Sequence, residues 1–435
     1  MMRMDPSEES GQRTFSRKLA VFIGSAALLS SLAFILCHNS PVFDDVGNGH
    51  DASFYASEGI TVQAIRQQTN PTGPGSFVWI GLFSRWLGDG LQVQRLAVWL
   101  SWFILLVGSI FLIETPPLWA AFALCWIFPH SVMASGLVLT EGPALCLAFL
   151  GSLLFINALS TTGRLHTQLK FWISLLLMGL SVICRQYYLG LIPAAMMTLL
   201  LVSWRRQAHS IPFWALILSA IVISSPVASL VALWGGISSA SARSGALYKY
   251  TANVGLSWDR PLIAFLYVCL YLLAFTWPNL FRKTKWSLAV AFVAMLSSVA
   301  FAKLRHGDLL EEGPIRQSLT TVFHGGALLP VATLLLAAVA LYNAGNYIIL
   351  NFSNLRELFL KQPVFCLGSL FLFFFVAEQI GVGGTIPFYE RYLLQIGPFL
   401  GMVVFAAEKR LLKSHLATAV VMALLAQGML WRFAF

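Results

Sequence analysis

The chain has 435 residues, of which 58% are hydrophobic and 11% are charged, and its formal net charge is +10. A mean hydropathy of +0.75 excludes an ordinary soluble domain, in which about a quarter of the residues are charged. Apolar segments of roughly 20 residues recur without two-residue alternation, and such segments cross a bilayer as helices rather than as barrel strands. The sequence therefore predicts an all-α polytopic membrane protein, with residues 1–435 forming one multi-pass domain of about 11–13 transmembrane helices.

The chain begins with a polar segment, residues 1–18, which we expect to be a cytoplasmic tail. The first apolar segment, 19–37, is not followed by a small-residue cleavage site, so we interpret it as a retained anchor rather than a signal peptide. The further candidate spans are residues 94–113, 117–133, 141–158, 170–187, 188–204, 211–234, 261–281, 286–302, 326–344, 363–380, 394–408 and 415–433.

The basic residues indicate the orientation of these spans. If the N-terminus is cytoplasmic, the basic connectors at 161–170, 205–206, 282–285 and 409–413 all lie on the cytoplasmic side, as the positive-inside rule requires. On this assignment the cytoplasmic side carries the whole net charge of +10 and the opposite side is neutral. The positive charge therefore reports topology, and we expect no nucleic-acid partner.

The segment between the first two spans, residues 38–93, is an outer loop that is unusually acidic for this chain. We expect a half-polar helix on the membrane surface at 52–68 and, after the turn-rich sequence NPTGPG, an interfacial helix at 76–88. Carboxylates gathered at one membrane face, in a chain that mostly avoids charge, need an explanation.

Asp44, Asp45 and Asp51 are the candidate acid/base residues of this loop. A carboxylate at the boundary between water and membrane can take a proton from a hydroxyl if its pKa suits the task. The alternative is a solvated loop, because Asp is common beside Gly and Asn in turns.

Arg185 and Arg391 are the candidate phosphate-binding residues, because the forked donors of a guanidinium suit bidentate contact with phosphate. Each has a simpler interpretation: Arg185 lies at a predicted span end and can extend to the interface, while Glu390 beside Arg391 can neutralise it. Candidate substrate-binding residues accompany them, although Glu141 also suits a helix N-terminus and Tyr392 an aromatic belt. These candidates are Tyr55, Glu141, Gln186, Glu390 and Tyr392.

The six cysteines occur singly in or beside apolar runs, and neither they nor the histidines show the spacing of a metal site or a disulfide framework. We interpret the cysteines as small apolar packing residues.

Taken in order, these features resemble the GT-C superfamily of polyprenyl-phosphate-sugar-dependent glycosyltransferases, which includes the protein O-mannosyltransferase-like enzymes. The resemblance covers most of the chain through the order and spacing of its motifs rather than through one sharp signature. Its carriers are Asp44-Asp45, the DAxxY form at Asp51–Tyr55, NPTGPGSFVWIGLFSRWLG (70–88), Arg95-Leu96, GLSVICRQYYLGLIP (179–193), and Arg391-Tyr392 followed by Gly397-Pro398.

The chain also departs from the family pattern. Many members have Asp-Glu or Asp-x-Asp where this chain has adjacent aspartates, which leaves open which carboxylate is the base. Proline usually follows the equivalent of Arg185, whereas this chain has Gln186. A sizeable C-terminal soluble domain is not evident, which favours a lipid-linked or small glycan acceptor over a protein.

The resemblance implies a GT-C-like bundle and an inverting transfer of a monosaccharide from a polyprenyl phosphate. Arg185 and Arg391 would stabilise the phosphate, and Asp45 or Asp51 would activate the acceptor hydroxyl. Asp44 would act as an orienting residue or as the alternative base. Some relatives bind a divalent cation at the acidic motif, so one is an option at Asp44/Asp45, although the sequence does not require it. The implied location is the bacterial inner membrane with a periplasmic site, or the ER membrane in a eukaryote.

Three other functions stay open. A lipid or glycan transporter or flippase is the main alternative, but it usually places ionisable residues or broken helices near the bilayer midplane, whereas Glu141, Arg185 and Glu378 lie at predicted outer ends. A polysaccharide polymerase or ligase usually has its key loop late in the chain. A non-catalytic assembly subunit is the third alternative.

Overall fold

The computed structural model describes residues 6–42, 45–70, 72–128, 130–160, 168–205, 212–236, 238–244, 259–304, 309–310, 314–323, 328–380, 394–407 and 413–431. Within these ranges every regular element is a helix and no β-strand is present. The all-α fold class predicted from the sequence is confirmed.

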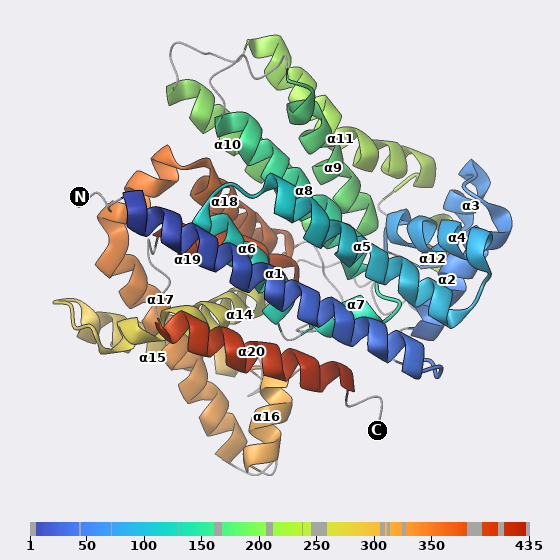
Figure 1. Ribbon diagram of the computed structural model, residues 1–435. Coiled ribbons are helices and arrows are strands. Elements are labelled where there is room, and N and C mark those ends of the chain that lie inside the picture. The colour runs from blue at the N-terminus through green and yellow to red at the C-terminus, as the bar shows by residue number, and fades with distance from the viewer. Residues whose placement is uncertain are drawn as a thin grey trace.

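Figure 1 shows how the elements are arranged. They are α1 (Pro6–Cys37), α2 (Asp45–Glu58), α3 (Val62–Gln67), α4 (Gly75–Leu87), α5 (Leu91–Leu112), α6 (Pro116–Ile127), α7 (Ser131–Gly136), α8 (Glu141–Ser160), α9 (Leu169–Cys184), η2 (Gln186–Tyr188), α10 (Leu191–Arg205), α11 (Phe213–Trp234), α12 (Ala240–Ser244), α14 (Asp259–Thr276), η4 (Trp277–Phe281), α15 (Ser287–Leu304), α16 (Pro314–Phe323), α17 (Leu328–Lys361), α18 (Pro363–Glu378), α19 (Gly397–Ala407) and α20 (Lys413–Trp431).

Seven helical segments in the described part of the chain are long and apolar enough to cross a membrane. They comprise α1, α5, α8, η2 with α10, α11, α14 with η4, and α17. Shorter apolar helices, namely α6, α9, α15, α18 and α19, lie beside them. The protein is therefore a multi-pass membrane protein, as the sequence predicts.

The predicted spans fall on helical segments, but several predicted limits are wrong. Helix α1 already begins at Pro6, and the 170–187 segment crosses the extended Arg185 between α9 and η2. The 117–133 segment is not one helix, because α6 ends at Ile127 and α7 begins at Ser131. Phe128 between them is extended (ψ 137°), and it precedes a proline, whose ring disfavours the helical conformation of the residue before it. The span predicted at 326–344 belongs to α17, which continues to Lys361.

The described residues of segment 38–93, which the sequence predicts to be an outer loop, contain the three helices α2, α3 and α4 rather than the two expected. The 52–68 segment is divided into α2 and α3 by Gly59, whose φ of +72° lies in the left-handed region that favours glycine. Thr61 then caps α3, because its side chain accepts a hydrogen bond from the Ala64 N–H. The helix predicted at 76–88 is confirmed as α4.

Helix α8 lies in the core of the bundle and packs between α5 and α9. Of its most apolar stretch, 78% is buried. Close crossings depend on small residues, as is common between membrane helices. A Cβ on Gly179 of α9 would lie 2.3 Å from the Ile223 carbonyl of α11. The helices α2, α3 and α4 gather at the end of the bundle where α1 ends (Figure 1). This end holds most of the described candidate residues.

Candidate functional site

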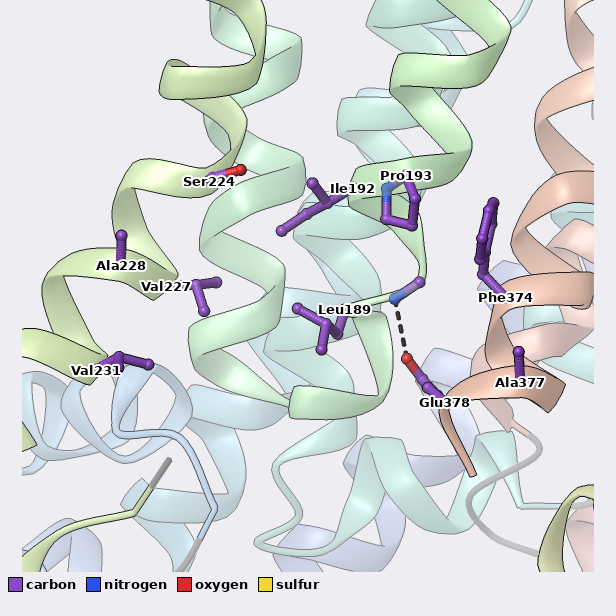
Figure 2. Close-up of a pocket in the computed structure, with 11 residues that line it drawn as sticks. Leu189, Ile192, Pro193, Ser224, Val227, Ala228, Val231, Phe374, Ala377 and Glu378 are labelled. Carbon is purple, nitrogen blue, oxygen red and sulfur yellow. Dashed lines mark hydrogen bonds between the residues drawn. The ribbon is translucent and has the colours of Figure 1, made fainter. Parts of the chain in front are cut away.

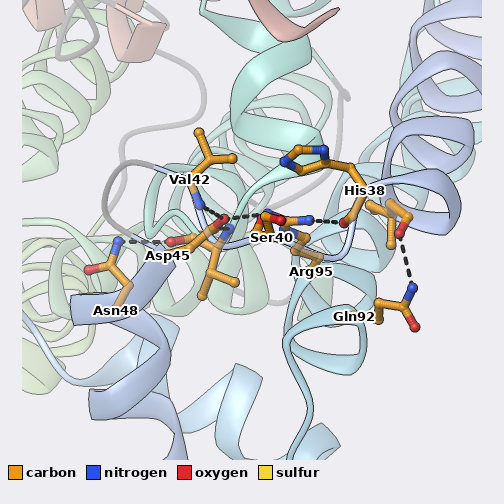
Figure 3. A network of polar contacts seen from close by, with 9 residues as sticks. His38, Ser40, Val42, Asp45, Asn48, Gln92 and Arg95 are labelled. Atoms are coloured by element: carbon orange, nitrogen blue, oxygen red, sulfur yellow. Dashed lines mark hydrogen bonds and ion pairs between the residues drawn. The ribbon is translucent and has the colours of Figure 1, made fainter. Parts of the chain in front are cut away.

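Asp45 fixes α2 to the bundle through a buried ion pair with Arg95 of α5 (Figure 3). Its Oδ2 atom lies 2.6 Å from Arg95 Nη2 and also accepts the Val42 N–H, and its Oδ1 atom accepts the Val138 N–H at 2.6 Å. Both side chains are fully buried. Each oxygen of this predicted catalytic carboxylate therefore has a protein donor.

Arg95 also donates to the carbonyl oxygens of His38 and Ser40, and its guanidinium lies over the ring of Phe34 at 5.4 Å. The pair thus ties the connection between α1 and α2 to α5. Arg95 already neutralises the Asp45 charge and Asp44 lies outside the described residues, so a divalent cation at Asp44/Asp45 stays a prediction.

Asp51 lies six residues after Asp45 on α2 but has a different environment. Its Oδ1 atom accepts the Thr69 hydroxyl at 3.1 Å, and its Oδ2 atom accepts the Asn70 amide at 2.9 Å. Burial raises the pKa of Asp51, while the two hydrogen bonds and the charge of His50 lower it. The residue keeps 8% of its exposure and no arginine or lysine pairs with it among the described contacts.

The segment that holds Asp51 is itself ordered by side-chain hydrogen bonds. Gln68 accepts the Tyr55 hydroxyl at 2.7 Å and donates to the carbonyl oxygens of Asn70 and Thr72. Burial raises the pKa of the Tyr55 phenol, and the Asp51 charge raises it further. Tyr55, a predicted substrate-binding residue, is 2% exposed, and its contact with this segment is the hydrogen bond to Gln68.

Arg185 and Glu141, predicted from separate motifs, form a second buried ion pair at 3.1 Å. Glu141 is the first residue of α8, and Arg185 is the extended residue between α9 and η2. The guanidinium also lies 5.4 Å from the ring centroid of Tyr187. Gln186 begins η2 beside this pair and is partly buried.

Three contacts with backbone carbonyl groups bring the segment around Asp51 to the Arg185–Glu141 pair. The Asn48 amide donates to the Val138 carbonyl at 2.8 Å, and the Ser76 hydroxyl donates to the Thr140 carbonyl at 2.8 Å. Gly73 lies so close to α9 that a Cβ would meet the Ile183 carbonyl at 1.9 Å. Segments 69–76, 138–141 and 183–187 therefore converge at one end of the bundle.

An apolar groove begins immediately after the arginine segment (Figure 2). It lies between the start of α10 and helices α11 and α18, has a volume of about 490 Å³, and includes Leu189, Pro193, Val227 and Phe374 among its lining residues. Glu378 lies at one end, where its Oε2 atom accepts the Gly190 N–H at 2.9 Å. The sequence predicted Glu378 at an outer helix end but did not predict the groove, because the groove forms between α10, α11 and α18, and α18 is far from the other two helices in the sequence.

Asp44, Glu390, Arg391 and Tyr392 lie outside the described residues. In the ranges that the structure describes, no group of three or more His, Cys, Asp or Glu side chains is arranged to hold a metal ion. The candidate site therefore consists of Asp51 with Thr69 and Asn70, the Arg185–Glu141 pair, and the groove.

Comparisons with models of known families, with curated proteins and with solved structures find no match to this chain.

Proposed function

We propose that the protein is a membrane glycosyltransferase that moves a monosaccharide from a polyprenyl phosphate to a hydroxyl of a lipid-linked or glycan acceptor. The observation that carries the proposal is the convergence of a carboxylate without a basic partner among the described ion pairs, a buried arginine and an apolar groove at one end of the bundle. The reaction needs a base, a cation for the leaving phosphate and a place for a lipid chain, and these three features match those needs.

Asp51 is the candidate base. Its pKa is raised by burial, and a base works best when its pKa approaches the working pH. One donor holds each oxygen, which leaves lone pairs on both to accept a proton from an acceptor hydroxyl. Asp45 is less suited because a buried guanidinium and two backbone N–H groups already bind its oxygens.

Arg185 is the candidate ligand of the donor phosphate. In the resting arrangement Glu141 holds the guanidinium in place, and an arriving phosphate brings the negative charge that this cation stabilises. Such electrostatic stabilisation is strongest where water is excluded, and both side chains are at most 7% exposed.

The groove is the candidate site for the first part of the polyprenyl chain. It is continuous with the arginine segment, because Leu189 and Gly190 line it only four and five residues after Arg185. Tyr187 adds a second link, since its ring contacts both the Arg185 guanidinium and Phe375 of α18. A lipid phosphate bound at Arg185 can therefore place its chain between α10, α11 and α18.

The proposed step is a displacement with inversion. The acceptor oxygen forms the new bond to the sugar C1 while Asp51 takes the hydroxyl proton, and the bond between C1 and the phosphate oxygen breaks. The electron pair of that bond stays on the polyprenyl phosphate, where Arg185 stabilises it. We place this end of the bundle on the periplasmic face of a bacterial inner membrane, or the ER lumen in a eukaryote, following the distribution of basic residues.

The experiment is transfer of radiolabelled sugar from a panel of polyprenyl-phosphate monosaccharides by the purified chain in proteoliposomes. The wild type should transfer the label from one donor to a lipid or glycan acceptor, and Arg185→Ala should lose about 100-fold or more in donor kcat/KM. Arg185→Lys keeps the positive charge but loses the forked N–H donors of the guanidinium. Its donor kcat/KM should therefore lie between those of the wild type and Arg185→Ala. Turnover by Arg185→Ala equal to the wild type would remove Arg185 from the site.

A second candidate, a lipid or glycan flippase, is favoured by one observation. The chain is interrupted between α9 and α10 beside a lipid-accessible groove, and interrupted helices are typical of transporter sites. The same proteoliposomes separate the two: a flippase moves the intact donor across the bilayer, whereas a transferase cleaves it.

A further inference from the structure

We infer that Thr69 and Asn70 are positioning residues that hold the Asp51 carboxylate ionised and in one orientation toward the acceptor. The inference rests on the proposed function and extends it. It names the side chains through which the 68–72 segment would control the base.

Thr69 and Asn70 each bind a different oxygen of the Asp51 carboxylate. Thr69 donates to Oδ1 and Asn70 donates to Oδ2, so the carboxylate cannot rotate without losing one of the bonds. A carboxylate oxygen has about two lone pairs, and one on each oxygen therefore stays available in a fixed direction.

Asn70 is itself held in the orientation that donates. Its Oδ1 atom accepts both the N–H and the hydroxyl of Thr72, at 3.0 and 2.8 Å, which turns its NH₂ group toward Asp51. Gln68 fixes the surrounding backbone through the carbonyl oxygens of Asn70 and Thr72, and the Ser239 hydroxyl donates to the Gln68 carbonyl. A segment used only as a connection would not need its donors specified to this degree.

Because Asp51 is buried, these two donors bear directly on whether its carboxylate is ionised. Burial favours the protonated carboxyl, and the Asn70 and Thr69 bonds act against it. The charge of His50 lowers the pKa of Asp51 together with the two bonds, and the Asp51 charge acts in turn on Tyr55. The other charged groups around this segment lie on α2, α3, α4 and α5, in the turn before α5 and in the Arg185–Glu141 pair. These groups are Asp45, Glu58, Arg66, Arg85, Asp89, Arg95, Glu141 and Arg185.

Two near-isosteric variants remove one donor each. Thr69→Val deletes the hydroxyl. Asn70→Asp keeps the oxygen that binds Thr72, replaces the NH₂ group with a second carboxylate oxygen and so adds a negative charge beside Asp51. Thr69→Ser restores the hydroxyl, and Thr72→Val removes one of the two bonds that orient Asn70 while keeping both donors to Asp51. All are made in the full chain in proteoliposomes.

The first measurement is the pH dependence of kcat/KM. The acid limb should move to higher pH in Thr69→Val and further in Asn70→Asp, with kcat/KM on that limb lower by about tenfold per lost bond. Thr69→Ser should keep the wild-type limb, and Thr72→Val should move the limb less than Asn70→Asp does, because the Thr72 N–H still orients Asn70. Equal losses at every pH, or a limb displaced by Thr72→Val as far as by Asn70→Asp, would show that the segment acts only as a structural support and overturn the inference.

The second measurement needs no turnover. Dicyclohexylcarbodiimide modifies protonated carboxyls in apolar surroundings, and peptide mass spectrometry reads the modification of Asp51 as a function of pH. The half-modification pH should rise in Thr69→Val and Asn70→Asp and return in Thr69→Ser. An unchanged value in both variants overturns the inference even if transfer is active, and a shift without transfer in the wild type overturns the proposed function alone. Repeating the series with His50→Gln removes the contribution of that imidazole.

Discussion

Two aspartates six residues apart on α2 show how neighbouring carboxylates acquire different uses. Asp45 faces a guanidinium and two backbone N–H groups and has no exposed side-chain surface. Asp51 faces a hydroxyl and an amide, which are neutral, and keeps part of its surface. A carboxylate that must exchange a proton suits the second environment and not the first.

Asp45→Asn should therefore destabilise the fold rather than act on a chemical step. The substitution leaves the buried Arg95 guanidinium without its counter-charge, and breaking a buried pair in this way costs about 3–5 kcal/mol. Thermal unfolding in detergent should show a clear fall in Tm.

The matched control is the double variant Asp45→Leu/Arg95→Leu, which removes both charges. It should melt at a higher temperature than Asp45→Leu alone, because no unpaired charge remains. A single variant as stable as the wild type would contradict the structural role of the pair.

At the scale of elements, the site depends on the docking of segment 69–76 against the end of α9. Gly73→Ala places a methyl group against the Ile183 carbonyl, where only 1.9 Å is available, so backbone must move and Asp51 must separate from Arg185. We expect a loss of about 100-fold in transfer, since small misplacements at a reacting centre have effects of this size.

Gly47→Ala is the control for that variant. Gly47 lies within α2 and a Cβ there would have no atom within 4 Å. Alanine in a helix interior should raise stability by about 0.5–1 kcal/mol and leave transfer unchanged. Full transfer by Gly73→Ala would show that the docking does not position the site.

The groove gives a prediction for lipid use. Ala228→Trp fills the space between α11 and α18 and should raise the KM for long polyprenyl donors about tenfold, with a smaller effect on short-chain analogues. Ala232→Trp makes the same change at an exposed α11 residue outside the groove lining. If the two variants give equal KM values, the chain binds elsewhere.

The elements were predictable to the extent that local sequence determines them. Apolar length places the spans, and the turn sequence after Gln68 separates the two predicted helices of the 38–93 segment from each other. The division at Gly59 and the interruption near Phe128 escaped prediction, because one glycine or one residue before a proline has little weight in a window of apolar residues.

At the scale of the whole molecule, the proposed function requires that the end of the bundle formed by α2, α3 and α4 faces the periplasm or the ER lumen. Cys37 is exposed at the end of α1, whereas the other five cysteines are buried. A membrane-impermeant maleimide should therefore label the wild type in intact cells, and Cys37→Ser should remove the label. Lys361→Cys in that background, at the exposed end of α17, should react only after permeabilisation. The reverse pattern would invert the proposed topology.

The candidate site was predictable only in its separate parts. Asp51, Glu141 and Arg185 each stand out in the sequence because ionisable residues are rare in apolar surroundings. Their pairing was not predictable, because Glu141 and Arg185 are far apart in sequence and Asp45 meets an arginine fifty residues away. Thr69 and Asn70 were missed because hydroxyl and amide side chains beside proline and glycine look like any turn.

The role of Asp51 as the base is tested by comparing single-turnover sugar transfer by Asp51→Asn and by the wild type, with the donor that the panel identifies. We expect a rate lower by about 100- to 10,000-fold, with donor affinity within about threefold of the wild type and an unchanged or higher Tm. A rate equal to that of the wild type, from a protein that melts normally, would contradict the assignment of Asp51 as the base.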